Sequence, residues 1–212
     1  MFKLSAIIQH FKDMRRYIAG SFILFFAGIV VGGTNDNFQA FLGSQLEGLQ
    51  QMAQMVDQAS GGDPNREALI LSVVIFLNNT IKSILIMYMG ALFGVLPFLF
   101  LVINGMVIGY LLKLIAEDPS AMPVLEVIVK GLLPHGIIEI PAIVIACAYG
   151  LKFGGLSFRL CGSLLFSRGK LGGIGKEIEF FAIRTVPMIV ILTVSLLVAA
   201  LIESTLTRAL LN

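Results

Sequence analysis

Five long apolar segments follow one another along the chain, separated by shorter polar stretches. Each holds about twenty residues with few charges, which is the length that an α-helix needs to cross the hydrocarbon core of a bilayer. The runs are continuous and do not alternate at a period of two, as the strands of a membrane barrel would. The pattern predicts an all-α, polytopic helical membrane protein, with residues 1–212 forming a single membrane domain and with spans at 17–33, 68–90, 98–116, 134–153 and 184–203.

Two further segments carry apolar residues at intervals of three or four, which is typical of one face of a helix. The first, residues 1–16, is also basic, so we expect an N-terminal amphipathic interfacial helix on the membrane surface. The second lies within residues 34–67, where we expect an external loop with an amphipathic helix over 38–56. The apolar positions are Leu4, Ile7, Ile8, Phe11 and Met14 in the first, and Phe38, Leu42, Leu46, Leu49, Met52 and Val56 in the second.

The composition agrees with a membrane protein. Hydrophobic residues make up 57% of the 212 residues and charged residues only 13%, against roughly 25% charged in an average soluble domain. The net charge of +2 is small, so we expect the lipid bilayer and no nucleic acid as a partner. Cys147 and Cys161 lack CxxC spacing, and we expect both to be small apolar residues without a disulfide or a metal.

The positions of the basic residues predict the orientation of the spans. Ten of the fifteen Lys and Arg residues fall in two segments, the N-terminal one and a glycine-rich stretch at 152–184. With five spans both segments lie on the same side, which the positive-inside rule assigns to the cytoplasm. We therefore expect a multi-pass protein of the cell membrane with a cytoplasmic N-terminus, a cytoplasmic loop at 154–183 and an external C-terminus. The ten residues are Lys3, Lys12, Arg15, Arg16, Lys152, Arg159, Arg168, Lys170, Lys176 and Arg184.

Glycines four residues apart recur in the apolar segments, in the GxxxG spacing that lets two membrane helices approach closely. Four such pairs predict tight helix packing, either within one chain or between the copies of a homo-oligomer, for which a dimer is our first expectation. The pairs are Gly28/Gly32, Gly90/Gly94, Gly105/Gly109 and Gly150/Gly154.

A few polar side chains interrupt the predicted spans. An ionised acid or lysine near the bilayer centre costs about 2.5–3.5 kcal/mol on insertion scales. We therefore expect these side chains to face the interior of the helix bundle, either as hydrogen-bond partners between helices or as a functional site. They are Asn78, Asn79 and Lys82 in the second span, Asn104 in the third, and His135 and Glu139 in the fourth.

The fourth span opens with the stretch PHGIIEIPA at residues 134–142. His135 and Glu139 are four residues apart and so share one face of a helix. Pro134 suits a first helical turn, and Pro141 removes a backbone hydrogen bond, so we expect a kink there. The motif is either a structural clamp or a functional site. A direct ion pair between Lys82 and Glu139 is a further hypothesis, which requires the fourth helix to begin earlier than Pro134.

Catalytic patterns are missing from the sequence. The chain has only two histidines and no HExxH, whereas a zinc site needs three or four ligands. No nucleophile motif or nucleotide-binding glycine loop is found either. We therefore expect no enzyme, no metal and no cofactor.

Three stretches resemble the SpoIIM (stage II sporulation protein M) family of membrane proteins: PHGIIEIPAIVIACAYGLKFGG at 134–155, FLNNTIKSI at 76–84 and LVINGMVIGYLL at 101–112. The resemblance implies a five-span protein without enzymatic activity that organises peptidoglycan-remodelling partners in the cell envelope. The residues that match the family's motifs are Asn78, Asn79, Asn104, Gly105, Pro134, His135, Glu139 and Pro141.

Two functions remain open at this point. One is a membrane scaffold or assembly protein of the SpoIIM type, which docks envelope or membrane protein partners. The other is a transporter, channel or permease-like subunit that moves protons, ions or a small solute through a polar bundle interior. A continuous polar cavity through Asn78, Asn104 and Glu139 would favour transport, and a dry clamp would favour the scaffold.

Overall fold

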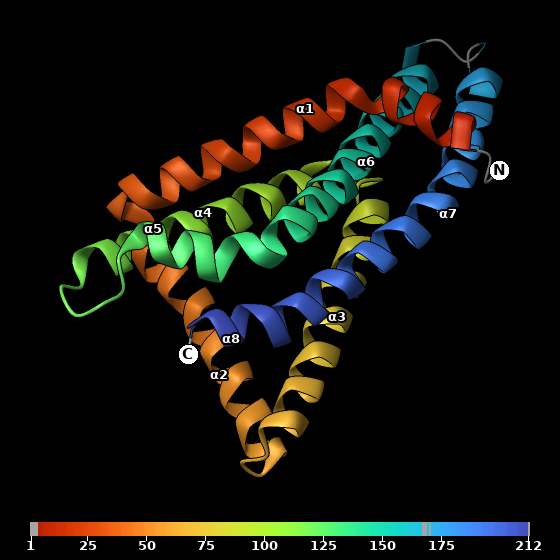
Figure 1. Ribbon diagram of the computed structural model, residues 1–212. Coiled ribbons are helices and arrows are strands. Elements are labelled where there is room, and N and C mark those ends of the chain that lie inside the picture. Colours follow the sequence, from red (N-terminus) through yellow and green to blue (C-terminus); the bar gives the residue numbers. More distant parts are fainter. Residues whose placement is uncertain (1–3, 167–168, 170, 212) are drawn as a thin grey trace.

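The computed structural model describes residues 4–166, 169 and 171–211, and the described chain is helical, without strands. Five helices are long and apolar enough to cross a membrane, which confirms the predicted fold class. Figure 1 shows their arrangement. They are α1 (Leu4–Thr34), α3 (Pro64–Met89), α4 (Val95–Glu117), α6 (Leu133–Phe166) and α7 (Leu171–Ile202).

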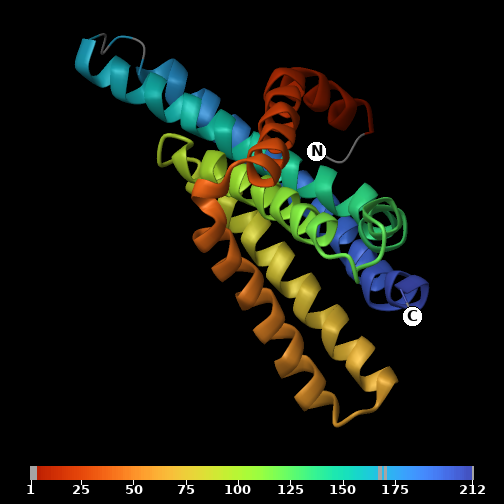
Figure 2. The same ribbon diagram turned by 90° about the vertical axis from the view of Figure 1, so that its left-hand side faces the viewer.

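The N-terminal segment does not form a separate helix. Helix α1 runs from Leu4 into the first span without a break. Its N-terminal part is bent relative to the remainder of α1 (Figure 2). Met14 and His10 are buried against other helices, so this part of α1 packs on the protein as well as preceding the span. Lys3, Arg168 and Lys170, which entered the predicted orientation, lie outside the described residues.

The helix expected after the first span is α2 (Gln39–Ser60), preceded by the short 3-10 turn η1 (Asp36–Phe38). Leu42 and Val56, two of the predicted apolar positions, are buried. Gly61 and Gly62 end the helix with positive φ angles of 65° and 80°, a conformation that glycine adopts without steric cost. Helices α2 and α3 therefore form an antiparallel hairpin, which is visible in Figures 1 and 2.

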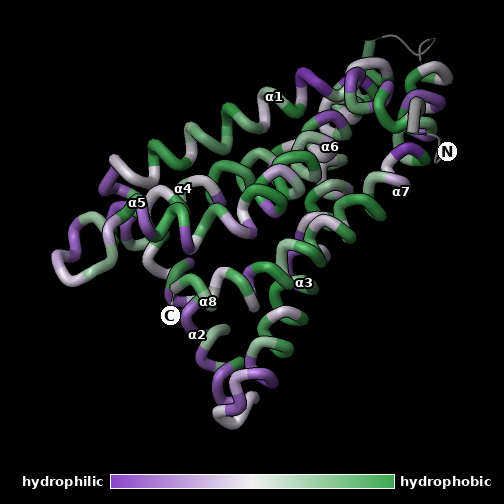
Figure 3. Tube along the Cα trace, in the orientation of Figure 1, coloured by the Kyte–Doolittle hydropathy of each residue, from purple (hydrophilic) through white to green (hydrophobic). Residues whose placement is uncertain are grey.

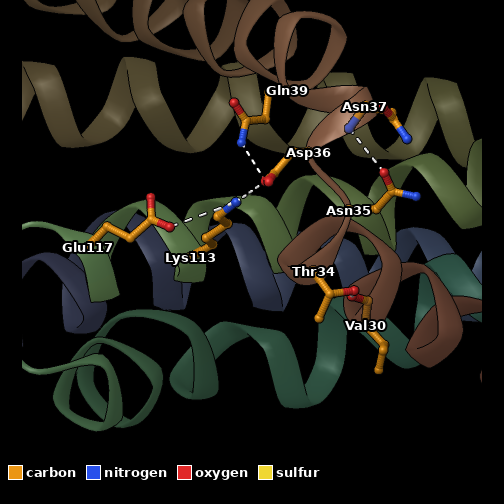
Figure 4. A network of polar contacts seen from close by, with 8 residues as sticks. All are labelled: Val30, Thr34, Asn35, Asp36, Asn37, Gln39, Lys113 and Glu117. Atoms are coloured by element: carbon orange, nitrogen blue, oxygen red, sulfur yellow. Dashed lines mark hydrogen bonds and ion pairs between the residues drawn. The ribbon is translucent and has the colours of Figure 1, made fainter.

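A polar network holds η1 against α4 (Figure 4). Asp36 forms an ion pair with Lys113, and Gln39 Nε2 donates to Asp36 Oδ1 at 2.6 Å. Glu117 lies 3.8 Å from the same ammonium group. The hydrogen bonds from Lys113 and Gln39 lower the pKa of Asp36 from its ordinary value of 3.8. The network fixes the point where the chain leaves α1 and enters α2.

The glycine pairs predicted from GxxxG spacing pack against one another within the chain. A Cβ atom added to Gly28 of α1 would lie 2.5 Å from Val102 O and 3.3 Å from the Cα atom of Gly105, both on α4. A Cβ atom added to Gly109 of α4 would overlap the carbonyl of Ile29 of α1. A Cβ atom on Gly90 would likewise overlap the backbone of Gly150, and one on Gly154 would overlap the backbone of Gly94. Gly28 meets Gly105 and Gly33, further along α1, meets Gly109, so α1 and α4 run parallel. In the same way Gly90 meets Gly150 and Gly94 meets Gly154, so the chain at the end of α3 runs parallel to α6.

The predicted loop at 154–183 is wrong, because most of this segment is helix. Helix α6 continues to Phe166, and α7 begins at Leu171. The glycines and basic residues suggested a loop, but the two helices pack against each other as an antiparallel hairpin (Figures 1 and 2). Arg159 of α6 and Glu177 of α7 form an ion pair at 2.9 Å across this extension. Tertiary packing thus overrides local helix propensity here.

The helical segment that contains the fourth span begins at Val124, earlier than the predicted residue 134. The short helix α5 (Val124–Glu126) and the π-helical turn η2 (Val127–Leu132) lead into α6 without a break. Pro134 cannot donate a backbone hydrogen bond, and a π turn just before it accommodates that missing donor. Helix α6 continues through Pro141. At the other end of the chain, a second π turn, η4 (Glu203–Thr207), joins α7 to α8 (Arg208–Leu211).

The surface of the long helices is apolar over most of its length. Ile23 of α1 is 69% exposed and Val194 of α7 is 56% exposed, and many other large apolar side chains face outward. Figure 3 shows hydrophilic residues gathered at the α2–α3 turn, at the loop after α4 and around the ends of α6 and α7. An apolar girdle between polar ends is the surface that a bilayer requires.

Candidate functional site

The polar residues predicted from the spans line one cavity. It has a volume of about 340 Å³ and lies between α1, α2, α3, α4, η2, α6 and η4. Pro134 and Pro141 are not in its lining, and of the predicted packing glycines none is. The predicted residues that line it are Asn78, Asn79, Lys82, Asn104, His135 and Glu139.

Glu139 is the central acid of this cavity. Asn79 Nδ2 of α3 donates to Glu139 Oε1 of α6 at 2.8 Å, and Asn78 Nδ2 in turn lies 3.4 Å from Asn79 Oδ1. The second carboxyl oxygen, Oε2, is buried and has no hydrogen-bond partner among the described residues. Asn79 therefore holds one oxygen of the carboxyl group in place, and the other oxygen is left without a partner.

The ion pair between Lys82 and Glu139 does not form. Lys82 lines the cavity, but its side chain is exposed, and within the part of the chain that the structure describes it makes no ion pair. Helix α3 presents Asn79 to the acid instead, three residues before Lys82. Asn104 of α4 donates to the backbone oxygen of Phe100 at 2.6 Å, so its amide is partly engaged by its own helix.

Sequence reasoning missed a second acid, Glu203. It belongs to η4, lines the cavity and lies with His135 and Glu139 in a group whose potential ligand atoms are all within 4.8 Å of one another. One signal could have indicated it, because LLVAALIESTLT carries a single acid at the end of the most apolar span. Its distance of 64 residues along the chain from Glu139 hid the contact.

The turn η4 supplies the other contacts of the site. His135 Nδ1 lies 3.2 Å from Thr207 Oγ1, which orients the imidazole ring. Ser204 and Ser72 share a buried hydrogen bond that ties η4 to α3. A π turn carries one residue more than an α turn, and such turns are frequent at functional sites. Here one π turn precedes His135 and the other contains Glu203 and Thr207.

The electrostatics of the site follow from this geometry. Two carboxyl groups lie side by side in a region screened by apolar helices, where charges interact more strongly than in water. Two carboxylates that share a site cannot both remain ionised without a compensating positive charge. The arrangement therefore needs a proton or a bound cation between Glu139 and Glu203.

A second cavity of about 240 Å³ lies between α1 and α7, lined by Ile7, His10, Phe180, Ile183, Arg184, Pro187 and Met188. His10 is only 5% exposed, and neither ring nitrogen has a partner among the described residues. Its ring packs edge-on against Tyr149 at 5.4 Å between centroids. Arg184 forms an ion pair with Asp13 at 3.6 Å.

Comparison with known proteins gives one match. The family described as stage II sporulation protein M matches residues 21–208, which include the five long helices in large part and all residues of the site around Glu139. No curated protein and no solved structure matches the chain. The chain belongs to the SpoIIM family.

Proposed function

We propose that this SpoIIM-family protein takes up a cation or a small polar solute in the cavity around Glu139 and moves it across the membrane. One observation carries the proposal: Asn78, Asn79, Asn104, His135 and Glu139 line a common cavity within a bundle of apolar helices. A purely structural clamp would fill this space with packed side chains. Ionisable groups inside a membrane bundle are expensive and usually mark a path for ions or solutes.

The unpartnered oxygen of Glu139 supports the same proposal. A buried polar atom without a partner costs about 1–3 kcal/mol, and the side chain that carries this oxygen lines a cavity that can hold a ligand. A bound cation, proton or polar solute would remove that cost. The protein would then be most stable in its loaded form.

The test is flux into vesicles that contain the purified protein. Wild-type protein should move protons or one member of a panel of cations and small solutes, and Glu139→Gln should abolish that movement. Glu177→Gln removes an acid at the α6–α7 extension and should leave the flux unchanged. Wild-type vesicles that are tight to the whole panel, or full flux in Glu139→Gln, would refute the proposal.

A scaffold that docks peptidoglycan-remodelling partners is the second candidate, as the family resemblance implies. Helix α2 supports it, because Phe41, Leu49 and Met55 are 44%, 48% and 62% exposed on its surface. Replacing Phe41 and Met55 by Ser should release such partners from the purified complex while the protein remains folded. Unchanged partner recovery would exclude α2 as the docking surface.

We also propose that the N-terminus is cytoplasmic and the C-terminus external in the cell membrane. In intact cells of a variant without native cysteines, a cysteine at Gly61 should react with an impermeant maleimide, and one at Gly175 should not. The reverse labelling would invert the topology. A homodimer is our proposal for the assembly, and a mass of one chain in detergent would contradict it.

A further inference from the structure

We propose that His135, Glu139 and Glu203 bind a divalent ion of the first transition series, with zinc as the probe. The inference rests on the proposed function and deepens it, because it names the class of cation that the cavity takes. The sequence led to the expectation of no metal site, since only two histidines are present in the chain. The fold supplies the missing ligand from η4.

The chemistry of the three side chains fits such an ion. Imidazole and carboxylate together suit zinc, iron and manganese, whereas magnesium prefers oxygen ligands alone. His135 and Glu139 lie at positions i and i+4 of α6, a spacing that places two ligands on one face of a helix. Three protein ligands leave a coordination position open for water or for exchange. An open position is what an ion that enters and leaves requires.

The distances are close to those of a loaded site. The potential ligand atoms lie within 4.8 Å of one another. Ligands bonded to zinc at about 2.0–2.2 Å lie no more than roughly 4 Å apart. Side-chain rotations that move the carboxylate oxygens by less than about 1 Å would bring the three ligand atoms to bonding distance from one ion. The cavity beside these side chains leaves room for such a movement.

The neighbouring side chains act as an outer shell. Asn79 binds Glu139 Oε1 and leaves the buried, unpartnered Oε2 free as a ligand atom. Thr207 contacts His135 Nδ1 and leaves Nε2 free. In known metal sites, partners of this kind fix the orientation of the ligands, and their loss weakens metal affinity by about 10–100-fold.

Charge balance supports the same assignment. Glu139 and Glu203 bring two carboxyl groups to one point, and the exposed Lys82 forms no ion pair with either in the described chain. A divalent ion between two carboxylates leaves the cluster neutral. The three-residue cluster then adds no net charge to the bundle interior, which is the least costly state for it in a membrane.

The test measures zinc binding to the purified, chelator-treated protein in detergent by titration calorimetry. Wild-type protein should bind one zinc ion per chain, and Glu203→Gln should weaken the binding by more than about 100-fold, beyond the effect of an outer partner. Thr207→Val should weaken it by about 10–100-fold. The control Glu177→Gln should bind as the wild type does. Absence of stoichiometric zinc binding, or equal affinity in Glu203→Gln, would overturn the inference.

A measurement on the wild type alone guards against variants that do not fold. X-ray absorption of the zinc-loaded protein should show one imidazole and further oxygen ligands, and a shell of oxygen alone would overturn the assignment. Flux separates this inference from the proposed function. Zinc binding without any flux would refute transport and keep the metal site, whereas flux of another solute without zinc binding would keep transport and refute the metal site.

Discussion

The close packing of helix α1 on helix α4 yields a graded prediction. On helix α1, Gly20 has no atom within 4 Å of an added Cβ, Gly33 has the carbonyl oxygen of Gly109 at 3.3 Å, and Gly32 would overlap the backbone of Met106. Three Gly→Ala substitutions on one helix therefore differ only in the space that the new methyl group finds. The order of their stabilities reports how closely α1 and α4 approach.

The magnitudes follow from two opposing effects. Alanine is favoured over glycine in a helix interior by about 1 kcal/mol, so Gly20→Ala should be neutral or slightly stabilising. Overpacking usually costs about 1–3 kcal/mol, and in Gly32→Ala the obstacle is backbone, which cannot rotate aside. The propensity gain is common to both variants, so they should differ by the overpacking cost alone, roughly 1–3 kcal/mol. Gly33→Ala should fall between them, since the carbonyl must give way by only a few tenths of an ångström.

The assay is unfolding by sodium dodecyl sulfate in mixed micelles, followed by circular dichroism. Gly32→Ala should unfold at the lowest fraction of the denaturing detergent and Gly20→Ala at the highest. Equal midpoints for these two variants would mean that α1 and α4 do not approach through this face. The GxxxG packing within the chain would then be refuted.

Three further outcomes are expected. Asp36→Asn should remove a pH-dependent part of the stability, because the hydrogen bonds from Lys113 and Gln39 lower the pKa of Asp36 in the folded protein. The ionised Asp36 carboxylate therefore stabilises the fold fully above its ordinary pKa of 3.8, and this stabilisation is lost as the pH falls through the lowered pKa of the folded state. Unfolding midpoints measured against pH should therefore drop more steeply in acid for the wild type than for the variant. Tyr149→Phe removes a buried hydroxyl without a described partner and should raise the stability by about 1 kcal/mol, and a loss of that size would contradict the burial. Arg159→Gln breaks a half-exposed ion pair with Glu177 and should change the free energy of unfolding by at most about 1 kcal/mol.

The sequence predicted the fold class because the signal for a span lies in composition and length alone. Apolar runs of about twenty residues indicate crossing helices whatever their neighbours are. The ends of the helices were less predictable. Helices α6 and α7 extend well past the predicted span boundaries at 153 and 184, since glycine and basic residues lower local propensity without forbidding a helix that packs against a partner.

The GxxxG pairs illustrate what spacing can and cannot predict. The spacing indicated close approach, and the structure places every one of the four pairs at a close contact. It could not indicate that Gly28 meets Gly105 and that Gly32 meets Met106, because the choice of partner depends on how all five helices are arranged. The same four pairs would also have fitted an interface between two copies.

The site was predicted in part for a similar reason. Asn79, His135 and Glu139 could be identified because a polar residue in an apolar span is conspicuous by itself. Their partners depend on register: a shift of one turn along α3 separates the predicted Lys82 contact from the observed Asn79 contact. Glu203 stood at the predicted edge of the last span, where an acid usually faces water, but it belongs to the π turn η4 and lines the cavity.

The two π turns have a consequence for the phase of the helices that carry the site. Each residue of an α-helix advances by 100° around the axis, so one surplus residue in a turn rotates everything beyond it by about that amount. Because of η4, the direction in which Thr207 points does not depend on which face of α7 is turned to the lipid. Deleting one residue between 203 and 207 would restore regular α periodicity and swing the imidazole's partner away from His135. Insertions and deletions in this short turn would thus change the contacts of His135 without altering the helices around the site.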